Sequence, residues 1–230
     1  MIRTFSVKEV LRFAYEKVRD NFSFFFSLVA VMFLVSVPQY IYSYATDAEG
    51  LNMQFSLWVS LSALFIFGFI RIVTEIGQIR IMFAQLNSKF LPVSTLFEIN
   101  NRYIKEFVIG YVLYFLIILS GFILLIIPAI IWSYKYSQWK YLVVDENLSA
   151  WGALKKSATI TNGNKGKLFS FGFVYGLMTL IGAIPLGLGL IITTPMGWIA
   201  GVYIYRFLNT SHKGEITEDM PTLDGEVLTR

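Results

Sequence analysis

Four apolar blocks dominate the sequence and limit the chain to a membrane fold. They cover residues 22–44, 55–70, 107–144 and 168–208. A helix that crosses the ~30 Å hydrocarbon core needs roughly 20 residues, and each block approaches or exceeds that length. The blocks show no alternation of apolar and polar residues, so helices rather than a β-barrel would satisfy the backbone in lipid. With 56% hydrophobic and only 15% charged residues, the chain also differs from an ordinary soluble domain.

The two longer blocks should each form a helical hairpin. Block 107–144 would be about 57 Å long as a single helix, nearly twice the hydrocarbon thickness. Gly121 and Pro128 predict its break, because glycine permits a tight reversal and proline removes a backbone donor. Pro185 and the glycines of 182–189 predict a similar break in the last block. We therefore expect an all-α membrane protein with six transmembrane helices, arranged as three hairpins.

Basic residues predict how these helices are oriented. Loop 45–54 contains two acidic residues and no Lys or Arg, and the turns near 121–128 and 182–185 carry no charge. All 19 Lys and Arg residues lie toward the other ends of the predicted spans. The positive-inside rule then places both termini in the cytoplasm. We expect residues 1–208 to form a single helical membrane domain and residues 209–230 a flexible acidic cytoplasmic tail.

A short amphipathic segment with a helix-capping signal precedes each hairpin. The first begins at Ser6, with Glu9 completing a capping box, and the second at Thr95, with Glu98. The third begins at Ser149 and lacks the glutamate. We expect each segment to be a short helix in the cytoplasmic interface, with its apolar face toward lipid and its lysines toward anionic headgroups. A repeated unit is one interpretation, and ordinary amphipathic loops between spans are the other.

Few residues could carry catalytic chemistry. The only histidine, His212, lies beyond the last predicted span, and the chain has no cysteine. No group of His, Asp and Glu has the spacing of metal ligands. The sequence therefore predicts no catalytic, cofactor-binding or metal-binding residues, and we expect a protein that is not an enzyme.

Ionisable groups within apolar blocks are costly in lipid, which makes them candidate functional residues. Glu75 follows Arg71 by one helical turn, so the two can pair. Lys135 and Gln138 lie on one stripe of the predicted fourth span. We hypothesise that Glu75 and Lys135 meet in a polar recess, open to the cytoplasm, that accepts a lipid headgroup or another amphiphile. In the alternative interpretation, Glu75 closes a structural pair and Lys135 extends its amine to the interface.

Small residues in the last hairpin are spaced for close helix packing. They are Gly172, Gly176, Gly197 and Gly201. Glycines four residues apart let helix backbones approach, so we expect the last two spans to pack together. A homodimer face at the same glycines is the alternative.

The second half of the chain resembles a known membrane family. The similar segments are 127–131 (IPAII), 144–149 (VDENLS), 153–157 (ALKKS) and 161–164 (TNGN). They are similar to segments of YciC-like bacterial inner-membrane proteins and of the membrane domain of some glycerophosphodiester phosphodiesterases, with Pro-Ala-Ile in place of the usual Pro-Gly-Ile. This resemblance implies a six-span domain in the bacterial inner (plasma) membrane, and it transfers no catalytic residue.

Two functions fit these features. The leading interpretation is a non-enzymatic scaffold that binds lipids or a protein partner, in envelope maintenance. The alternative is a small transporter or permeation pathway for ions or amphiphiles, which would need a recess that reaches the membrane midplane. The expected partners are lipids of the anionic inner leaflet, with a membrane protein or a second copy of the chain as further candidates and no nucleic acid.

Overall fold

The computed structural model describes residues 4–48, 53–185 and 187–213, and every regular element in these ranges is a helix. The all-α prediction is therefore confirmed for the part of the chain described. Among the residues described, four helices are long and apolar enough to cross a membrane, which supports a membrane protein. The candidate spans are Phe22–Tyr42, Ser60–Leu86, Asn101–Leu124 and Lys165–Ala183. Most of the predicted tail, from residue 214 on, lies outside the described residues.

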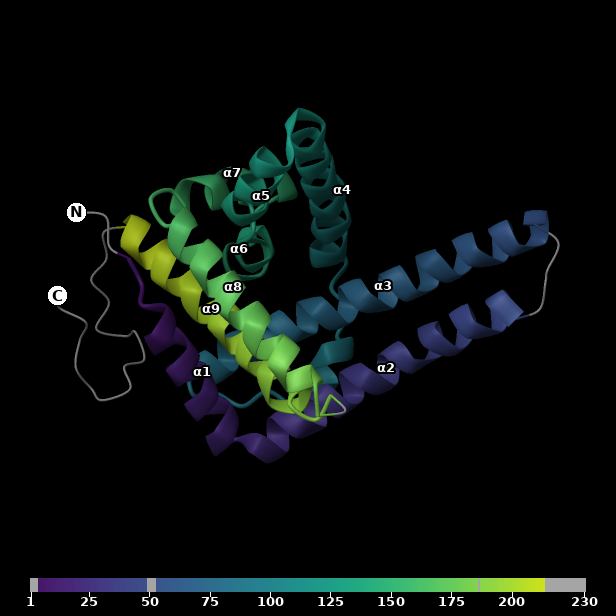
Figure 1. Cartoon of the computed structure of the whole chain (residues 1–230), viewed down its shortest axis with the longest axis horizontal. Helices are drawn as coiled ribbons and strands as arrows, with labels where there is room; N and C mark the ends of the chain where they lie inside the picture. Colours follow the sequence, from purple (N-terminus) through teal and green to yellow (C-terminus); the bar gives the residue numbers. More distant parts are fainter. Residues whose placement is uncertain (1–3, 49–52, 186, 214–230) are drawn as a thin grey trace.

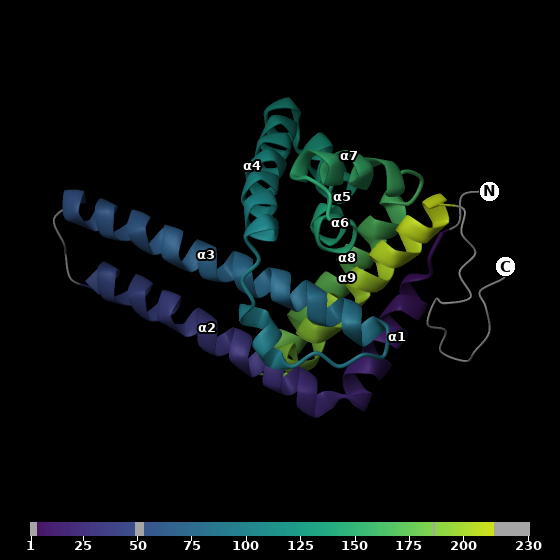
Figure 2. The same ribbon diagram turned by 180° about the vertical axis from the view of Figure 1, so that it is seen from behind.

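The first hairpin follows a short amphipathic helix. Helix α1, Val7–Asp20, begins as predicted, with the Ser6 side chain accepting a hydrogen bond from the Glu9 amide. Helices α2, Phe22–Ala48, and α3, Met53–Leu86, then run together away from the rest of the chain (Figures 1 and 2). Many of their apolar side chains are exposed, as expected for surfaces that face lipid.

The second amphipathic segment is not the helix that its capping signal predicts. Only a short 3₁₀ helix, η1 (Val93–Phe97), forms there, and no side chain caps it. Thr95 is buried instead, because η1 packs its backbone against α3 at Gly77. Helix α4, Asn101–Leu124, has its own N-cap at Asn100, whose side chain accepts a hydrogen bond from the Arg102 amide.

The second hairpin turns near the predicted residues. Helix α4 ends before Leu125, which is extended, and α5, Ile126–Lys135, returns beside it. Gly121 lies against the backbone of Ala129, so the two helices approach closely. Helix α5 has 10 residues, which is too short to cross a bilayer alone.

A helical break separates α5 from α6, Trp139–Glu146, within the predicted fourth span. Helix α7, Ala150–Ile160, stabilises this break from the side, because its Ser157 and the following Thr161 donate hydrogen bonds to the Lys135 carbonyl. The Ser157 hydroxyl also accepts a hydrogen bond from the Gln138 amide at 3.1 Å. Helix α7 itself begins at the predicted cap, Ser149, whose hydroxyl accepts from the Gly152 amide.

The last hairpin is formed by α8, Lys165–Ala183, and α9, Leu190–Lys213. Gly182 and Gly189 meet across its turn, where the Gly189 amide donates to the Gly182 carbonyl, and Gly187 adopts the left-handed backbone conformation. Helix α9 is the central helix of the fold, in contact with α1, α2, α3, α7 and α8. Its second half is buried almost continuously in the hydrophobic core.

The apolar face of α1 packs on α9 and not toward lipid. Phe13 is 4% exposed, with its ring 4.9 Å from that of Tyr203, and Phe5 lies edge-on to Phe207. The expectation of a lipid-facing surface is therefore wrong for this segment. An amphipathic pattern requires an apolar neighbour, and a protein helix meets that requirement as well as a bilayer does.

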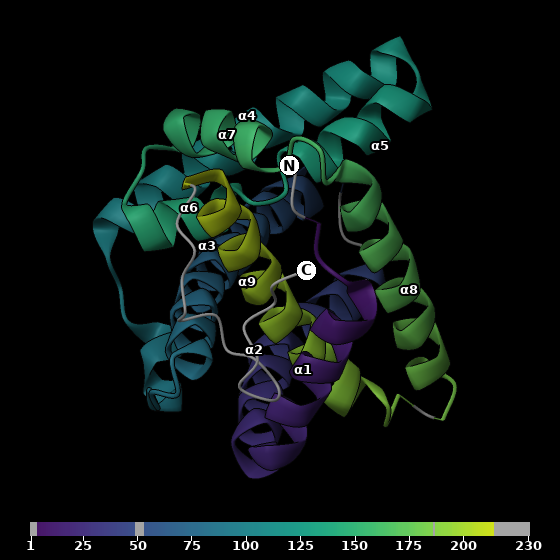
Figure 3. The ribbon, with the colours of Figure 1, turned by 90° about the vertical axis from the view of Figure 1, so that its left-hand side faces the viewer.

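The helix pairs α2–α3, α4–α5 and α8–α9 point in different directions (Figures 1 and 3). The turn between α4 and α5 and the turn between α8 and α9 lie at opposite ends of the molecule in Figures 1 and 3, and the α2–α3 hairpin extends in a third direction. The parallel bundle implied by six spans is therefore not the arrangement seen. The core gathers instead around α1, the inner end of α3, α6, α7 and α9.

Candidate functional site

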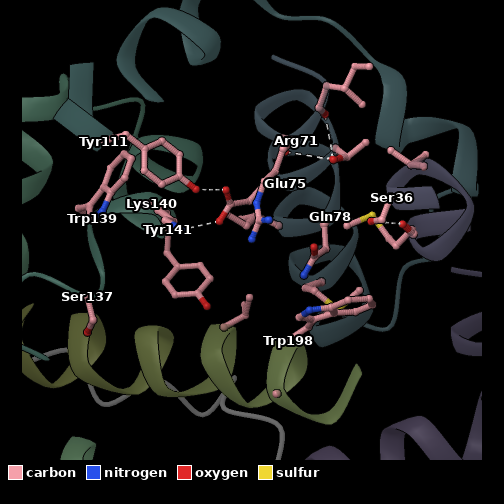
Figure 4. Close-up of a pocket in the computed structure, with 18 of the residues that line it drawn as sticks. Ser36, Arg71, Glu75, Gln78, Tyr111, Ser137, Trp139, Lys140, Tyr141 and Trp198 are labelled. Atoms are coloured by element: carbon pink, nitrogen blue, oxygen red, sulfur yellow. Dashed lines mark hydrogen bonds and ion pairs between the residues drawn. The ribbon is translucent and has the colours of Figure 1, made fainter. Parts of the chain in front are cut away.

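A recess of about 550 Å³ lies where the three hairpins meet (Figure 4). Helices α2, α3, α4, α6 and α9 all contribute to it, and we call it the central recess. Its polar lining residues are Ser36, Gln39, Arg71, Thr74, Glu75, Gln78, Tyr111, Tyr114, Ser137, Lys140 and Tyr141. Apolar groups from α2, α3 and α9, among them Met32, Ile70 and Trp198, complete its walls.

An ion pair links two of the converging helices in the central recess. The Lys140 amine on α6 lies 2.6 Å from one carboxylate oxygen of Glu75 on α3. The Tyr111 hydroxyl on α4 donates to the other carboxylate oxygen. Lys140 also lies over the Tyr111 ring, 4.7 Å from its centre. Both charged side chains are largely covered, at 22% exposure for Glu75 and 28% for Lys140, so each depends on its partner more than a surface pair would.

Trp139 fixes the position of Lys140. Its ring is almost fully buried, packs on Phe107 and Tyr111, and occupies the space that a side chain at position 110 would fill. Gly110 therefore allows Trp139 to lie against the backbone of α4. Because Lys140 is the next residue, this anchor directs the neighbouring amine toward α3.

Arg71 lines the central recess without a carboxylate partner. Within the part of the chain that the structure describes, the ion pair of Glu75 is made by Lys140, and none is made by Arg71. The predicted pairing of Arg71 with Glu75 is therefore not observed. Arg71 lies one turn from Glu75 on α3, beside the pair in Figure 4. The recess thus contains two cations and one anion.

Lys135 and Gln138 lie outside the central recess, so the predicted meeting of Glu75 with Lys135 is wrong. Lys135 lines a different cavity, and its amine lies 5.1 Å from the centre of the Tyr136 ring. Gln138 is buried, and its side-chain amide donates to the Ser137 hydroxyl. The helical break after Lys135 removes the common stripe on which the prediction depended. The signal for Lys140 was a lysine between two aromatic residues in an apolar segment.

The central recess reaches the middle of three candidate membrane helices. Its lining on α3 extends from Phe67 to Met82, across the centre of the candidate span Ser60–Leu86. Tyr111 and Tyr114 lie near the centre of the candidate span on α4, and the α2 lining begins at Met32. This depth is what a transport pathway requires, and it also suits a binding site for a lipid-dissolved ligand.

Three of the four predicted packing glycines lie against tyrosine side chains, and the fourth faces open space. A side chain at Gly172 would overlap Tyr134, one at Gly197 would overlap Tyr175, and one at Gly201 would overlap Tyr141. Gly176 faces open space. The spacing thus makes room for aromatic rings, whereas the close backbone contact of this hairpin lies at its turn.

A second polar cluster joins α6, α7 and α9. Glu146 pairs with Lys156 at 2.5 Å and accepts from the Asn209 amide, while Tyr205 donates to Asp145 at 2.7 Å. Each of the five side chains forms a hydrogen bond or an ion pair with another member of the cluster, which indicates a structural connection between these helices.

Neither a metal site in the described residues nor a similarity to known proteins indicates a reaction. Within residues 4–48, 53–185 and 187–213, no three His, Cys, Asp or Glu side chains are grouped to hold a metal ion. Comparisons with protein-family models, with curated proteins and with solved structures find no match to this chain.

Proposed function

We propose that this chain is an integral membrane protein that binds an amphiphile with an anionic or zwitterionic head in the central recess. The observation that carries the proposal is a charged recess at the middle of three candidate membrane helices. Charges at such depth are expensive in lipid and are retained mainly where they serve binding or transport. The proposed activity is binding without chemical conversion of the ligand.

The charges of the recess favour an acidic group in the ligand. Glu75 and Lys140 neutralise each other, which leaves the guanidinium of Arg71 as the uncompensated charge. Guanidinium binds phosphate and carboxylate groups through paired hydrogen bonds. Apolar walls that include Met32 and Ile70 suit an acyl chain attached to such a head.

Bound lipid tests the proposal directly. The chain would be purified in a mild detergent as wild type, as Arg71→Gln and as Arg80→Gln, and co-purified lipids would be quantified by mass spectrometry. Arg80 is the matched control, because it lies on the same helix, pairs with Glu98 and does not line the recess. We expect Arg71→Gln alone to lose a specific acidic or zwitterionic amphiphile. Equal lipid content in all three proteins would reject the site.

For the membrane arrangement we propose six crossings in the bacterial inner membrane, with both termini cytoplasmic, as in the YciC-like family that the sequence resembles. Helix α9 has 24 residues, enough for a crossing, and α5 with α6 would form an interrupted fourth span. The contact of Phe5 with Phe207 supports both chain ends lying on one side. Because the hairpins diverge, this topology requires them to become more parallel in a bilayer.

The absence of cysteine from the sequence makes this topology easy to test. Single cysteines would replace Ile123, in the exposed last turn of α4, and Lys89, just after α3. A membrane-impermeant thiol reagent should label the first in intact cells and the second only after permeabilisation. Labelling of position 89 from outside would contradict the proposed orientation.

Transport is the second candidate, favoured by the depth of the recess. A carrier would move its amphiphile between leaflets, whereas a scaffold would only retain it. Purified protein in liposomes that contain a fluorescent phospholipid separates the two, since an added quencher detects movement between leaflets. If the phospholipid moves between leaflets faster with the wild type than with Arg71→Gln, the chain is a carrier. If it moves no faster than in protein-free liposomes, the binding scaffold is the remaining candidate.

A further inference from the structure

A second cavity, of about 560 Å³, lies between α4, the end of α5, α7 and the start of α8. We call it the lysine pocket, after Lys135, Lys155 and Lys165, which all line it. The lysines come from three different elements. Lys135 is held near α7 through its carbonyl, which accepts the Ser157 and Thr161 hydrogen bonds.

The lysine pocket has an uncompensated positive charge. Within the described ranges, none of its three lysines forms an ion pair, and no Asp or Glu lines it. The contrast with Lys156 is direct, since that residue follows Lys155 in the sequence but pairs with Glu146 outside this pocket. Three amines around one cavity, without a carboxylate, form a site for a multiply accepting anion such as a phosphate group.

The remaining lining is apolar and aromatic. Trp151 on α7 is 66% exposed, and Ile117 comes from the candidate membrane helix α4. Leu124, two turns further along α4 on the same side as Ile117, is also exposed and extends this apolar surface. Tryptophan is enriched at membrane interfaces, where its ring lies between acyl chains and headgroups. The cavity therefore has cationic groups beside a surface that suits acyl chains.

We propose that the lysine pocket binds the phosphate of an anionic phospholipid, with the acyl chains along α4 and the headgroup against Trp151. A soluble phosphate would use the lysines but leave the apolar surface exposed to water. A phospholipid covers both, and three cations favour a headgroup with net negative charge over a zwitterionic one. This site is separate from the central recess and does not depend on the function proposed there.

Quenching of Trp151 fluorescence provides the test. The full chain in zwitterionic detergent micelles would be titrated with brominated phosphatidylglycerol and, separately, with brominated phosphatidylcholine. We expect saturable quenching by the anionic lipid at lower concentration than by the zwitterionic one. The quenching should fall in Trp151→Phe, which identifies the signal among the five tryptophans of the chain. Equal quenching by both lipids, or an unchanged signal in Trp151→Phe, would overturn the proposal.

Charge variants identify the residues involved. Each of Lys155→Gln and Lys165→Gln should weaken phosphatidylglycerol binding about five-fold, the loss expected for one lysine beside an anionic headgroup. Lys167→Gln is the matched control, because this exposed lysine lies two residues from Lys165 and does not line the pocket. An equal loss in Lys167→Gln would show general surface attraction and reject the site, as would full binding in the double variant K155Q/K165Q with an unchanged circular dichroism spectrum.

A competition arm separates a lipid site from a phosphate site. Inorganic phosphate and glycerol phosphate would be added to the complex with brominated phosphatidylglycerol at constant ionic strength. We expect no displacement at millimolar concentrations, because neither covers the apolar surface. Displacement of the lipid by either soluble anion would overturn the assignment to phospholipid.

Discussion

Breaking the ion pair between Glu75 and Lys140 should destabilise the protein, whereas removing Lys135 should not. Loss of one partner from a fully buried pair costs about 3–5 kcal/mol, while a fully exposed pair contributes about 0–1 kcal/mol. At 22% and 28% exposure, and with Tyr111 donating to the same carboxylate, this pair lies between these limits. We expect Lys140→Met to lower the free energy of unfolding by about 2 kcal/mol.

A double-mutant cycle isolates the interaction itself. Glu75→Gln removes the negative charge but keeps a group that can accept from Tyr111, so its cost should be similar to or smaller than that of Lys140→Met. The double variant should cost about 1–2 kcal/mol less than the sum of the single variants, because the second substitution removes a charge that the first left unpaired. Unfolding in mixed micelles of mild and denaturing detergent, followed by far-ultraviolet circular dichroism, provides the free energies.

Lys135 supplies the control for the cycle. It lies in the other cavity, so Lys135→Met should change the free energy of unfolding by no more than about 0.5 kcal/mol and should be additive with Glu75→Gln. The reasoning is refuted if Glu75 couples to Lys135 and not to Lys140. That result would mean that α5 and α6 form one continuous helix, as the hydropathy of the sequence suggests.

Three further substitutions, two of them with a matched control substitution, test the packing. Gly77→Ala would overlap the backbone of η1 and should cost about 1–3 kcal/mol, whereas Gly68→Ala on the same helix meets open space and should gain about 0.5–1 kcal/mol in the same unfolding assay. Ser157→Ala removes the buried hydroxyl that stabilises the break between α5 and α6, and it should lower the free energy of unfolding by about 1–3 kcal/mol. The exposed Ser170→Ala is the control, and an equally small cost for both substitutions would contradict this role of Ser157. Phe13→Ala should cost about 3–5 kcal/mol if α1 packs on α9, and much less if that face only touches detergent.

Local sequence chemistry predicted much of the secondary structure. Ser6 and Ser149 cap the helices that their positions indicate, and Gly121 and Pro185 lie at or near the turns of the last two hairpins. Each of these features depends on residues close together in the chain. The capping signal at Thr95 failed because tertiary contact with α3 buries that residue.

Hydropathy could not predict what the apolar surfaces face. The apolar stripe of α1 has the same pattern whether its neighbour is lipid or a helix, and only the fold shows that the neighbour is α9. Similarly, the glycines of the last hairpin have the spacing of backbone contacts but lie against tyrosine rings. Both outcomes depend on residues distant in sequence, which a pattern within one segment does not contain.

The break between α5 and α6 determines the two cavities, and no glycine or proline in 136–138 indicates it. Its stability comes from Ser157 and Thr161 on the side of α7, which satisfy the carbonyl that the interrupted helix leaves free. Since the break redirects the chain between Lys135 and Lys140, the first amine points to the lysine pocket and the second to Glu75. Five residues along an unbroken helix correspond to a rotation of about 140°, so the two lysines would already face different sides, and the break adds a change in the direction of the chain. The hydroxyl groups of Ser157 and Thr161 thus stabilise the break that lies between Lys135, in the lysine pocket, and Lys140, beside Glu75.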